Sequence, residues 1–332
     1  MGDQKTVRIG VMSFGHMHAQ SYARCVKELP GVELAGVADD DRARGEAMAS
    51  QFNTRFYPSY EALLGAGVDA VIVSSENAKH RRLVEVAAAA GKHVLCEKPL
   101  CTTMADGRAM IEACAEAGVK LQTAFPCRYS QPLLEAKPLV DSGQLGQILA
   151  LAGTNRGMNP GGWFTDESLS GGGAVMDHTV HVADLMRFVS GAEVVEVYAE
   201  IDNLLFKQDY DDMGVLTLAF DSGAFGSIDT SWSRPKSFPF WGDVTLEIVG
   251  TGGVVGIDMF AQALHLYSDK EMKHSYRYWG GDIDLGLIKS FVNAVANDTP
   301  VEITGEDGLA AVEVTLAAYE SAKHAEPVRL PL

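Results

Sequence analysis

The sequence predicts an α/β protein in which a doubly wound parallel sheet is followed by a second α/β domain built on a large, mostly antiparallel open sheet. Up to about residue 124, short apolar runs alternate with helical patterns, as in a parallel sheet covered by helices. From about residue 125, alternation of apolar and polar residues dominates, interrupted by turn signals such as Asp221-Ser222-Gly223. We therefore expect domains at 1–124 and 125–332, with the last helix free to pack back on the first domain.

Composition restricts the classes of partner. The chain has 332 residues, 47% of them hydrophobic and 21% charged, and a formal net charge of −17. Such an acidic chain is not expected to bind nucleic acid or an anionic membrane surface. An odd number of cysteines without a Cys-x-x-Cys pair predicts neither a disulfide framework nor a structural zinc site. With no apolar run long enough to span a bilayer and no signal-peptide pattern, the expected location is the cytoplasm.

The N-terminal region has the order strand, tight loop, helix, strand and acid. The first strand is expected at 6–12, the loop at 13–18, a helix through Glu28 and a second strand at 32–38, which runs into Asp39-Asp40-Asp41. This is the arrangement of a Rossmann dinucleotide site, in which the helix N-terminus holds the pyrophosphate and the acid binds ribose hydroxyls. Of the three fingerprint glycines only Gly15 is present. Asp40 adds a second negative charge that favours NAD over NADP.

A lysine at the end of a buried strand is the main catalytic candidate. After helices at 42–52, 60–66 and 81–90 and a strand at 68–75, the apolar run Val94–Cys96 predicts a strand, and Glu97-Lys98-Pro99 follows it directly. A helix at 104–117 and a strand at 119–123 continue the alternation. The loops after the strands open at one edge of such a sheet, where ligands bind. The alternative is a surface lysine beside an acid.

The second domain carries the other candidates. Strands are expected at 195–201, 215–220, 224–233, 244–249 and 264–267, and their open face predicts a homodimer or homotetramer. A glycine triplet at 171–173 precedes a helix on which Asp177 and His181 are four residues apart, and Asp184 follows on a neighbouring line. A carboxylate beside a histidine tunes the imidazole to act as a base. The alternatives are an inconsequential surface pair and a metal site that uses His178. Because His178 is expected to point about a quarter-turn from Asp177, we expect no metal.

These motifs resemble the glucose–fructose oxidoreductase / inositol dehydrogenase / rhizopine-catabolism (Gfo/Idh/MocA) family. The resemblance covers nearly the whole chain and is carried by the block 91–100, Asn77, His80, the block 171–184 and the segments 307–308 and 319–322. It implies a Rossmann domain, a second domain with a large open sheet, NAD(P) as cofactor, and oxidation of a secondary alcohol on a sugar, cyclitol or derivative.

Position by position, the resemblance implies that Lys98 is the catalytic or substrate-anchoring lysine, His181 the acid/base and Asp177 its companion. The candidate cofactor-binding residues are Ser13, Phe14, Gly15, His16, Met17, Asp39, Asp40, Ser74, Ser75, Asn77, His80, Glu97, Lys98 and Arg128. The candidate substrate-binding residues are Lys98, Arg128, Asn155, Trp163, Asp177, His178 and His181. The chain departs from the family pattern at Ser13, His18 and His178, among other pocket positions, which points to an unusual substrate.

The expected reaction is hydride transfer, in which His181 takes the hydroxyl proton and Lys98 stabilises the charge that develops on the oxygen. Two other classes stay open. One is an enzyme that uses NAD transiently for elimination or glycoside cleavage, and the other is a sensor on the same fold.

Overall fold

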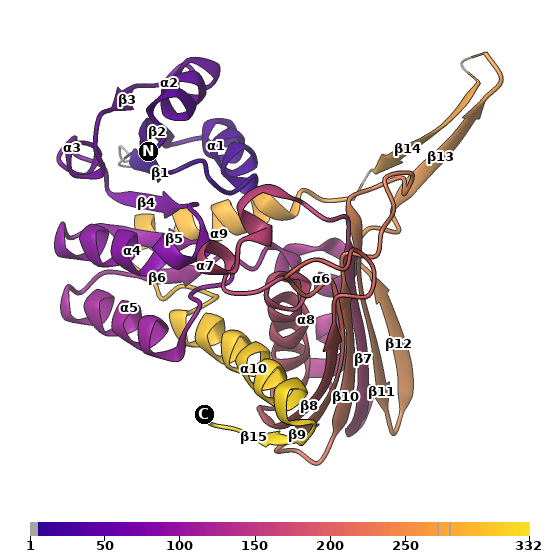
Figure 1. Ribbon diagram of the computed structural model, residues 1–332. Coiled ribbons are helices and arrows are strands. Elements are labelled where there is room, and N and C mark those ends of the chain that lie inside the picture. The colour runs from indigo at the N-terminus through magenta and orange to yellow at the C-terminus, as the bar shows by residue number, and fades with distance from the viewer. Residues whose placement is uncertain (1–5, 271, 279) are drawn as a thin grey trace. The chain divides into compact units, whose positions relative to one another are not determined.

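The computed structural model describes residues 6–270, 272–278 and 280–332 (Figure 1). The chain divides into two compact units, of which the first comprises Met1–Pro126 with Asp284–Leu309 and the second Cys127–Ile283 with Ala310–Leu332. The sequence placed the boundary at 124/125 and all later residues in the second domain. The segment 284–309 instead joins the first unit, where Asp298 pairs with Lys120 at 2.9 Å and the carbonyl of Ile303 accepts the Thr123 N–H at 3.2 Å.

The first unit contains a six-stranded sheet in the order β3-β2-β1-β4-β5-β6, in which every described strand pair is parallel. Its strands are β1 (Val7–Met12), β2 (Val32–Ala38), β3 (Phe56–Tyr57), β4 (Ala70–Val73), β5 (His93–Cys96) and β6 (Leu121–Thr123). Its helices are α1 (His18–Glu28), α2 (Arg42–Gln51), α3 (Tyr60–Leu64), η1 (Asn77–Lys79), α4 (His80–Ala89), α5 (Met104–Glu116) and most of α9 (Ile283–Asn297). The predicted doubly wound parallel sheet is confirmed.

The ends of four strands converge at one edge of this sheet. Met12 is the register partner of both Ala38 and Val73, and Val73 is in turn the partner of Cys96. The strands β1, β2, β4 and β5 therefore finish level with one another. Every residue of β4 is buried, which is why this run is apolar throughout rather than alternating. The predicted cofactor loops all follow these four strand ends.

The second unit contains a seven-stranded sheet in the order β12-β11-β7-β10-β9-β8-β15. Only the central β7–β10 pair is parallel, so the sheet is mixed and mostly antiparallel. Its strands are β7 (Ile148–Gly157), β8 (Val194–Asp202), β9 (Met213–Phe220), β10 (Phe225–Ser231), β11 (Gly242–Gly250), β12 (Gly253–Asp258) and β15 (Val328–Arg329), and β13 (Ala263–Ser268) pairs with β14 (Lys273–Tyr278) outside it. No strand was predicted at β7, β12, β14 or β15.

The long helix α8 (Ala174–Ser190) packs on one face of this sheet. A Cβ on Gly153 of β7 would run into Val182 and Met186 of α8, so the glycine allows the helix to approach closely. The remaining elements of this unit are η2 (Pro126–Tyr129), α6 (Gln131–Asp141), η3 (Gly162–Thr165), α7 (Glu167–Ser170) and the part of α10 (Gly305–His324) that follows Leu309. In the described ranges no helix combines the length and the apolarity needed to cross a bilayer.

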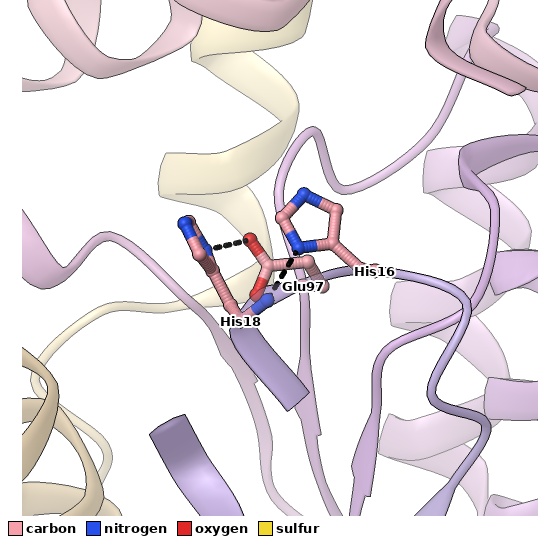
Figure 2. A group of neighbouring side chains, drawn as sticks. All are labelled: His16, His18 and Glu97. Carbon is pink, nitrogen blue, oxygen red and sulfur yellow. Dashed lines mark hydrogen bonds and ion pairs between the residues drawn. The ribbon is translucent and has the colours of Figure 1, made fainter. Parts of the chain in front are cut away.

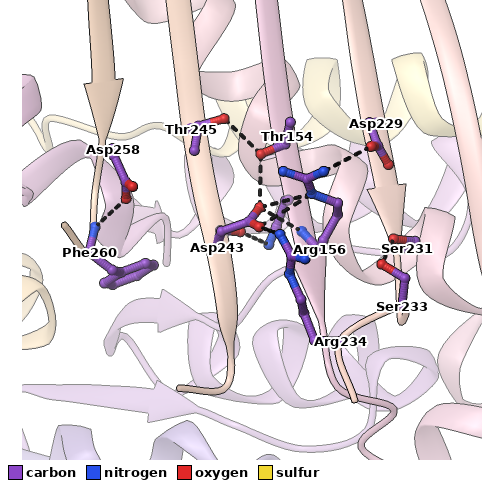
Figure 3. A network of polar contacts seen from close by, with 11 residues as sticks. Thr154, Arg156, Asp229, Ser231, Ser233, Arg234, Asp243, Thr245, Asp258 and Phe260 are labelled. Carbon is purple, nitrogen blue, oxygen red and sulfur yellow. Dashed lines mark hydrogen bonds and ion pairs between the residues drawn. The ribbon is translucent and has the colours of Figure 1, made fainter. Parts of the chain in front are cut away.

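The other face of the sheet carries exposed apolar side chains and a charged network. Val215, Phe225 and Val254 expose 50%, 65% and 60% of their surface. Figure 3 shows the network, which joins side chains of three neighbouring strands and the loop before β11. Its centre is Asp243 on β11, which contacts Thr154 and Arg156 of β7 and Arg234; Arg156 also reaches Asp229 of β10 at 3.4 Å.

Candidate active site

The loop after β1 has the conformation of a dinucleotide-binding turn although serine replaces its first glycine. Ser13 has φ 74°, in the left-handed region that costs most residues about 1 kcal/mol and glycine almost nothing. Its hydroxyl accepts the Gly15 N–H at 3.0 Å, which offsets part of that cost. A Cβ on Gly15 would lie 3.3 Å from the Glu76 carboxylate, so the one retained glycine stands where space is tight.

Asp39, the predicted ribose acid, is buried at the end of β2. Its carboxylate accepts the backbone N–H groups of Phe14 at 2.7 Å and Asp41 at 2.9 Å. Arg44 donates to both of its oxygens, at 2.6 and 2.9 Å. The sequence reasoning missed Arg44, although its place in the first turn of the helix after Asp39 was a usable signal. This hydrogen bond raises the pKa of Arg44 further, so the guanidinium stays charged.

Asp40, the second acid, also has a cationic partner. Lys79 lies 3.4 Å from its carboxylate and 3.0 Å from that of Glu76. The negative potential expected at the ribose is therefore reduced by two cations, Arg44 and Lys79, that the sequence analysis did not weigh.

The ends of β4 and β5 offer buried polar groups to a cofactor. The hydroxyl of Ser74 and the Oε2 atom of Glu97 have no hydrogen-bond partner among the described residues, and both side chains are 0% exposed. Such buried groups are costly unless something binds them. Ser75, Asn77 and Lys98 are also buried at these strand ends. The polar groups around the strand ends thus fit a dinucleotide cofactor.

His80 serves the loop that carries Lys98. It is completely buried; one ring nitrogen contacts the carbonyls of Pro99 at 3.0 Å and Leu100 at 3.3 Å, and the other contacts the carbonyl of Ser75 at 3.3 Å. Burial lowers its pKa, whereas the three carbonyls act in the opposite direction. The predicted role of His80 in the cofactor site is thus indirect, because its ring holds the backbone around Lys98 in place.

The carboxylate before Lys98 is surrounded by histidines of the β1–α1 loop (Figure 2). His18 Nδ1 lies 3.3 Å from Glu97 Oε1, and His16, His18 and Glu97 each place a nitrogen or oxygen atom within 4.8 Å of the others. Burial alone would raise the pKa of Glu97, but His16, His18 and Lys98 hold it below its ordinary range. Glu97 is therefore ionised.

In the second unit, an acid and a tyrosine from distant parts of the chain fix the start of α8. The carboxylate of Asp211 accepts the N–H groups of Gly173 and Val175, each at 2.8 Å, and the Tyr319 hydroxyl at 2.8 Å. A side chain on Gly173 would collide with the Asp211 carbonyl. The glycine triplet thus lets the helix N-terminus approach the half-buried Asp211 carboxylate, and a helix N-terminus is a favourable place for negative charge.

The structure pairs Asp177 with His178 and Trp232. His178 Nε2 lies 3.2 Å from Asp177 Oδ2, and the same oxygen accepts the Trp232 indole N–H at 3.3 Å. The expectation that His178 would point away from Asp177 was wrong, because the imidazole bends back and packs against Gly157, where a Cβ would lie 2.8 Å from its Cε1. The sequence analysis missed Trp232, which lies 55 residues from Asp177.

His181 is buried one turn further along α8. Asp184 follows three residues later and forms a buried ion pair with Arg128. The Nε and Nη2 atoms of Arg128 donate to the two Asp184 carboxylate oxygens at 2.8 and 2.5 Å. The guanidinium carbon of Arg128 also lies over the Phe188 ring, 4.7 Å from the centre of that ring. These contacts hold Arg128 against α8.

Asn155 and Trp163 complete the predicted set. Asn155 is buried on β7, donates to the Asp243 carbonyl at 3.0 Å, and keeps its Oδ1 without a hydrogen-bond partner among the described residues. Trp163 stacks on Phe164, which belongs to a small core cluster with Ala174 and Trp232. The predicted residues thus form one group at the strand ends of the first unit and another around the start of α8 in the second.

The comparisons with known proteins fit this arrangement. Residues 5–125 match the oxidoreductase family with an NAD-binding Rossmann fold, and residues 133–256 match the GFO/IDH/MocA C-terminal domain. The chain is 30% identical to the myo-inositol 2-dehydrogenase of Thermotoga maritima, over 98% of each chain. The chain belongs to the GFO/IDH/MocA family of NAD-binding oxidoreductases.

Two further proteins are similar to this chain over nearly its whole length. The scyllo-inositol 2-dehydrogenase (NAD(+)) of Bacillus subtilis is 28% identical over 98% of this chain and 96% of its own length. The crystal structure of GenD2 from gentamicin A biosynthesis, in complex with NAD, superposes with a TM-score of 0.91 at 27% identity, covering 99% of this chain and 97% of that one. The match of residues 5–125 to an NAD-binding Rossmann fold confirms the predicted dinucleotide-binding domain.

Proposed function

We propose that this oxidoreductase oxidises a secondary alcohol of a cyclitol, sugar or sugar derivative and transfers the hydride to NAD. Relatives that match nearly the whole chain are named inositol 2-dehydrogenases. The observation that carries the proposal is the position of Lys98. This lysine is buried just after β5, at the sheet edge where β1, β2, β4 and β5 all end.

The roles of the residues follow from their chemistry. Bound NAD supplies the hydride acceptor. The loop 13–17, Asp39, Ser74 and Glu97 would hold it. His181 takes the proton of the substrate hydroxyl, and Lys98 donates a hydrogen bond to the same oxygen and stabilises its negative charge. Asp177, fixed by His178 and Trp232, grips a neighbouring hydroxyl.

A screen of inositols, aldoses and their amino and deoxy derivatives for NADH absorbance tests this function. One NADH should accumulate for each substrate molecule consumed. Consumption of substrate without NADH would instead indicate transient use of the cofactor, and binding of sugars without turnover would indicate a sensor.

We expect NAD to be preferred over NADP, because the carboxylate of Asp39, the proposed ribose acid, would repel a 2′-phosphate and keeps Arg44 bonded to itself. Replacing Asp39 with serine would free Arg44 to bind a 2′-phosphate, and the preference should narrow by about tenfold or more. Dissociation constants of both cofactors measure this, with Asp41→Ser as a control for loss of charge. Equal affinity of the wild type for both would contradict this role of Asp39.

We further propose that copies of the chain associate into a homodimer or homotetramer through the outer face of the seven-stranded sheet. That face combines three exposed apolar side chains with the network around Asp243, and a mixture of this kind is typical of an interface between subunits. Light scattering should show an oligomer at micromolar concentration. Phe225→Asp should weaken it, whereas Leu134→Asp on α6 should not. A monodisperse wild-type monomer would refute the proposal.

A further inference from the structure

Several amide groups of the cofactor loop are already occupied by the chain itself. The Ser13 hydroxyl accepts the Gly15 N–H at 3.0 Å, and His16 Nδ1 accepts the His18 N–H at 3.2 Å. The His16 N–H donates to the Ser74 carbonyl at 2.9 Å. In a glycine-rich fingerprint such amides are the donors offered to the pyrophosphate. Here the Ser13 hydroxyl, the His16 ring and the Ser74 carbonyl accept three of these N–H groups.

The third fingerprint position carries an ionisable group instead. His18 is the first residue of α1, and its side chain is 32% exposed, whereas the Glu97 side chain that it contacts at 3.3 Å is 0% exposed. The second oxygen of Glu97 has no hydrogen-bond partner among the described residues. A buried, ionised carboxylate such as that of Glu97 is costly unless a cation lies beside it, and His18 lies beside it.

The groups facing His18 favour its charged form. They are Glu97 and Lys98 after β5, Asp284 of α9, Tyr22, whose hydroxyl lies 3.5 Å from Nδ1, and His16, whose ring centre lies 4.5 Å from that of His18. Burial has the largest effect and lowers the pKa of His18, but Glu97 and Asp284 together outweigh it, so the pKa lies above its ordinary value despite Lys98. His18 is therefore an imidazolium over more of the neutral range than a free histidine.

A bound metal ion would be another way to use two histidines and a carboxylate. The geometry disfavours it, because the lone pair of His16 Nδ1 is directed at the His18 backbone N–H. A charge pair needs no third ligand.

We propose that His18 is a cofactor-binding residue: held by Glu97, its imidazolium supplies the positive charge and hydrogen-bond donor for the NAD pyrophosphate that the occupied loop amides do not. NAD affinity is then coupled to the protonation of His18. As the pH rises through the pKa of His18, the charge is lost and NAD binds more weakly. The inference rests on NAD binding alone and is independent of the substrate.

Titration of NAD into the protein at pH values from about 6 to about 9, followed by calorimetry without substrate, tests the proposal. The wild-type dissociation constant should rise by about tenfold over this range. His18→Gln should bind weakly at every pH, and His18→Arg, whose charge is permanent, should bind tightly at every pH. The control His324→Gln removes a histidine from a surface pair with Glu320 and should titrate like the wild type.

Three results would overturn the proposal. One is a His18→Gln protein whose affinity keeps the wild-type pH dependence, and another is a His18→Arg protein that binds as weakly as His18→Gln although its circular dichroism is unchanged. The third is stoichiometric zinc that the wild type retains through dialysis and His18→Gln loses, which would make the cluster a metal site. Because no turnover is measured, a failure of the proposed substrate class would leave the test intact.

Discussion

Replacing Lys98 with methionine is expected to abolish turnover while NAD affinity stays within about threefold of the wild type. Methionine is similar in length and apolar, so it fills the buried position but cannot donate to the substrate oxygen. Glu97 keeps His18 as its cationic partner at 3.3 Å, so the variant should fold. Steady-state kinetics and NAD titration on the same preparation measure the two quantities.

The matched control is Lys323→Met, which removes an exposed lysine paired with Glu320 on α10 and should leave both quantities unchanged. Loss of NAD binding in parallel with turnover would show that Lys98 acts mainly on the cofactor. Retained turnover would remove Lys98 from the mechanism.

Replacing His181 with alanine is expected to lower kcat by roughly two to four orders of magnitude, the contribution of a positioned general base. The limb of the pH–rate profile near neutrality should disappear with it. In the double variant with Lys98→Met the losses should not add, since both residues act on one oxygen and its proton. Rates should be measured with excess enzyme so that residual activity is quantified.

His178→Ala is the informative comparison, because His178 lies against Asp177 at 3.2 Å. Its pH profile should keep the limb near neutrality, with a raised KM from the loosened Asp177. If that limb vanishes in His178→Ala and persists in His181→Ala, the two histidines exchange roles.

Local patterns were sufficient to predict the frame of the molecule. The apolar run Val94–Cys96 and the strand before Ser13 could be predicted because a strand buried on both faces needs uninterrupted apolar residues. The acid after Ala38 could be placed because a parallel sheet brings the ends of its strands level with one another. The periodicity of the second half likewise predicted a mostly antiparallel sheet. These features depend on neighbours within a few residues, and such neighbours are visible in a sequence.

Partners far apart in the chain were decided only by the tertiary structure. Asp211 and Tyr319, which are 108 residues apart, meet at the start of α8. Trp232, which directly follows β10, donates a hydrogen bond to Asp177. The segment 284–309 joins the first unit although more than 150 residues separate it from Pro126.

The charged groups of the cofactor loop show the same division. From the sequence, Ser13 and His18 could be seen to break the glycine fingerprint. It could not be seen that the side chains of Ser13 and His16 accept loop N–H groups, or that His18 meets Glu97, 79 residues away. Local conformation is set by short-range sterics and hydrogen bonding, and the sequence by itself determines much of it. Which ionised group compensates which depends on how the buried strands bring their ends together, and folding alone decides that.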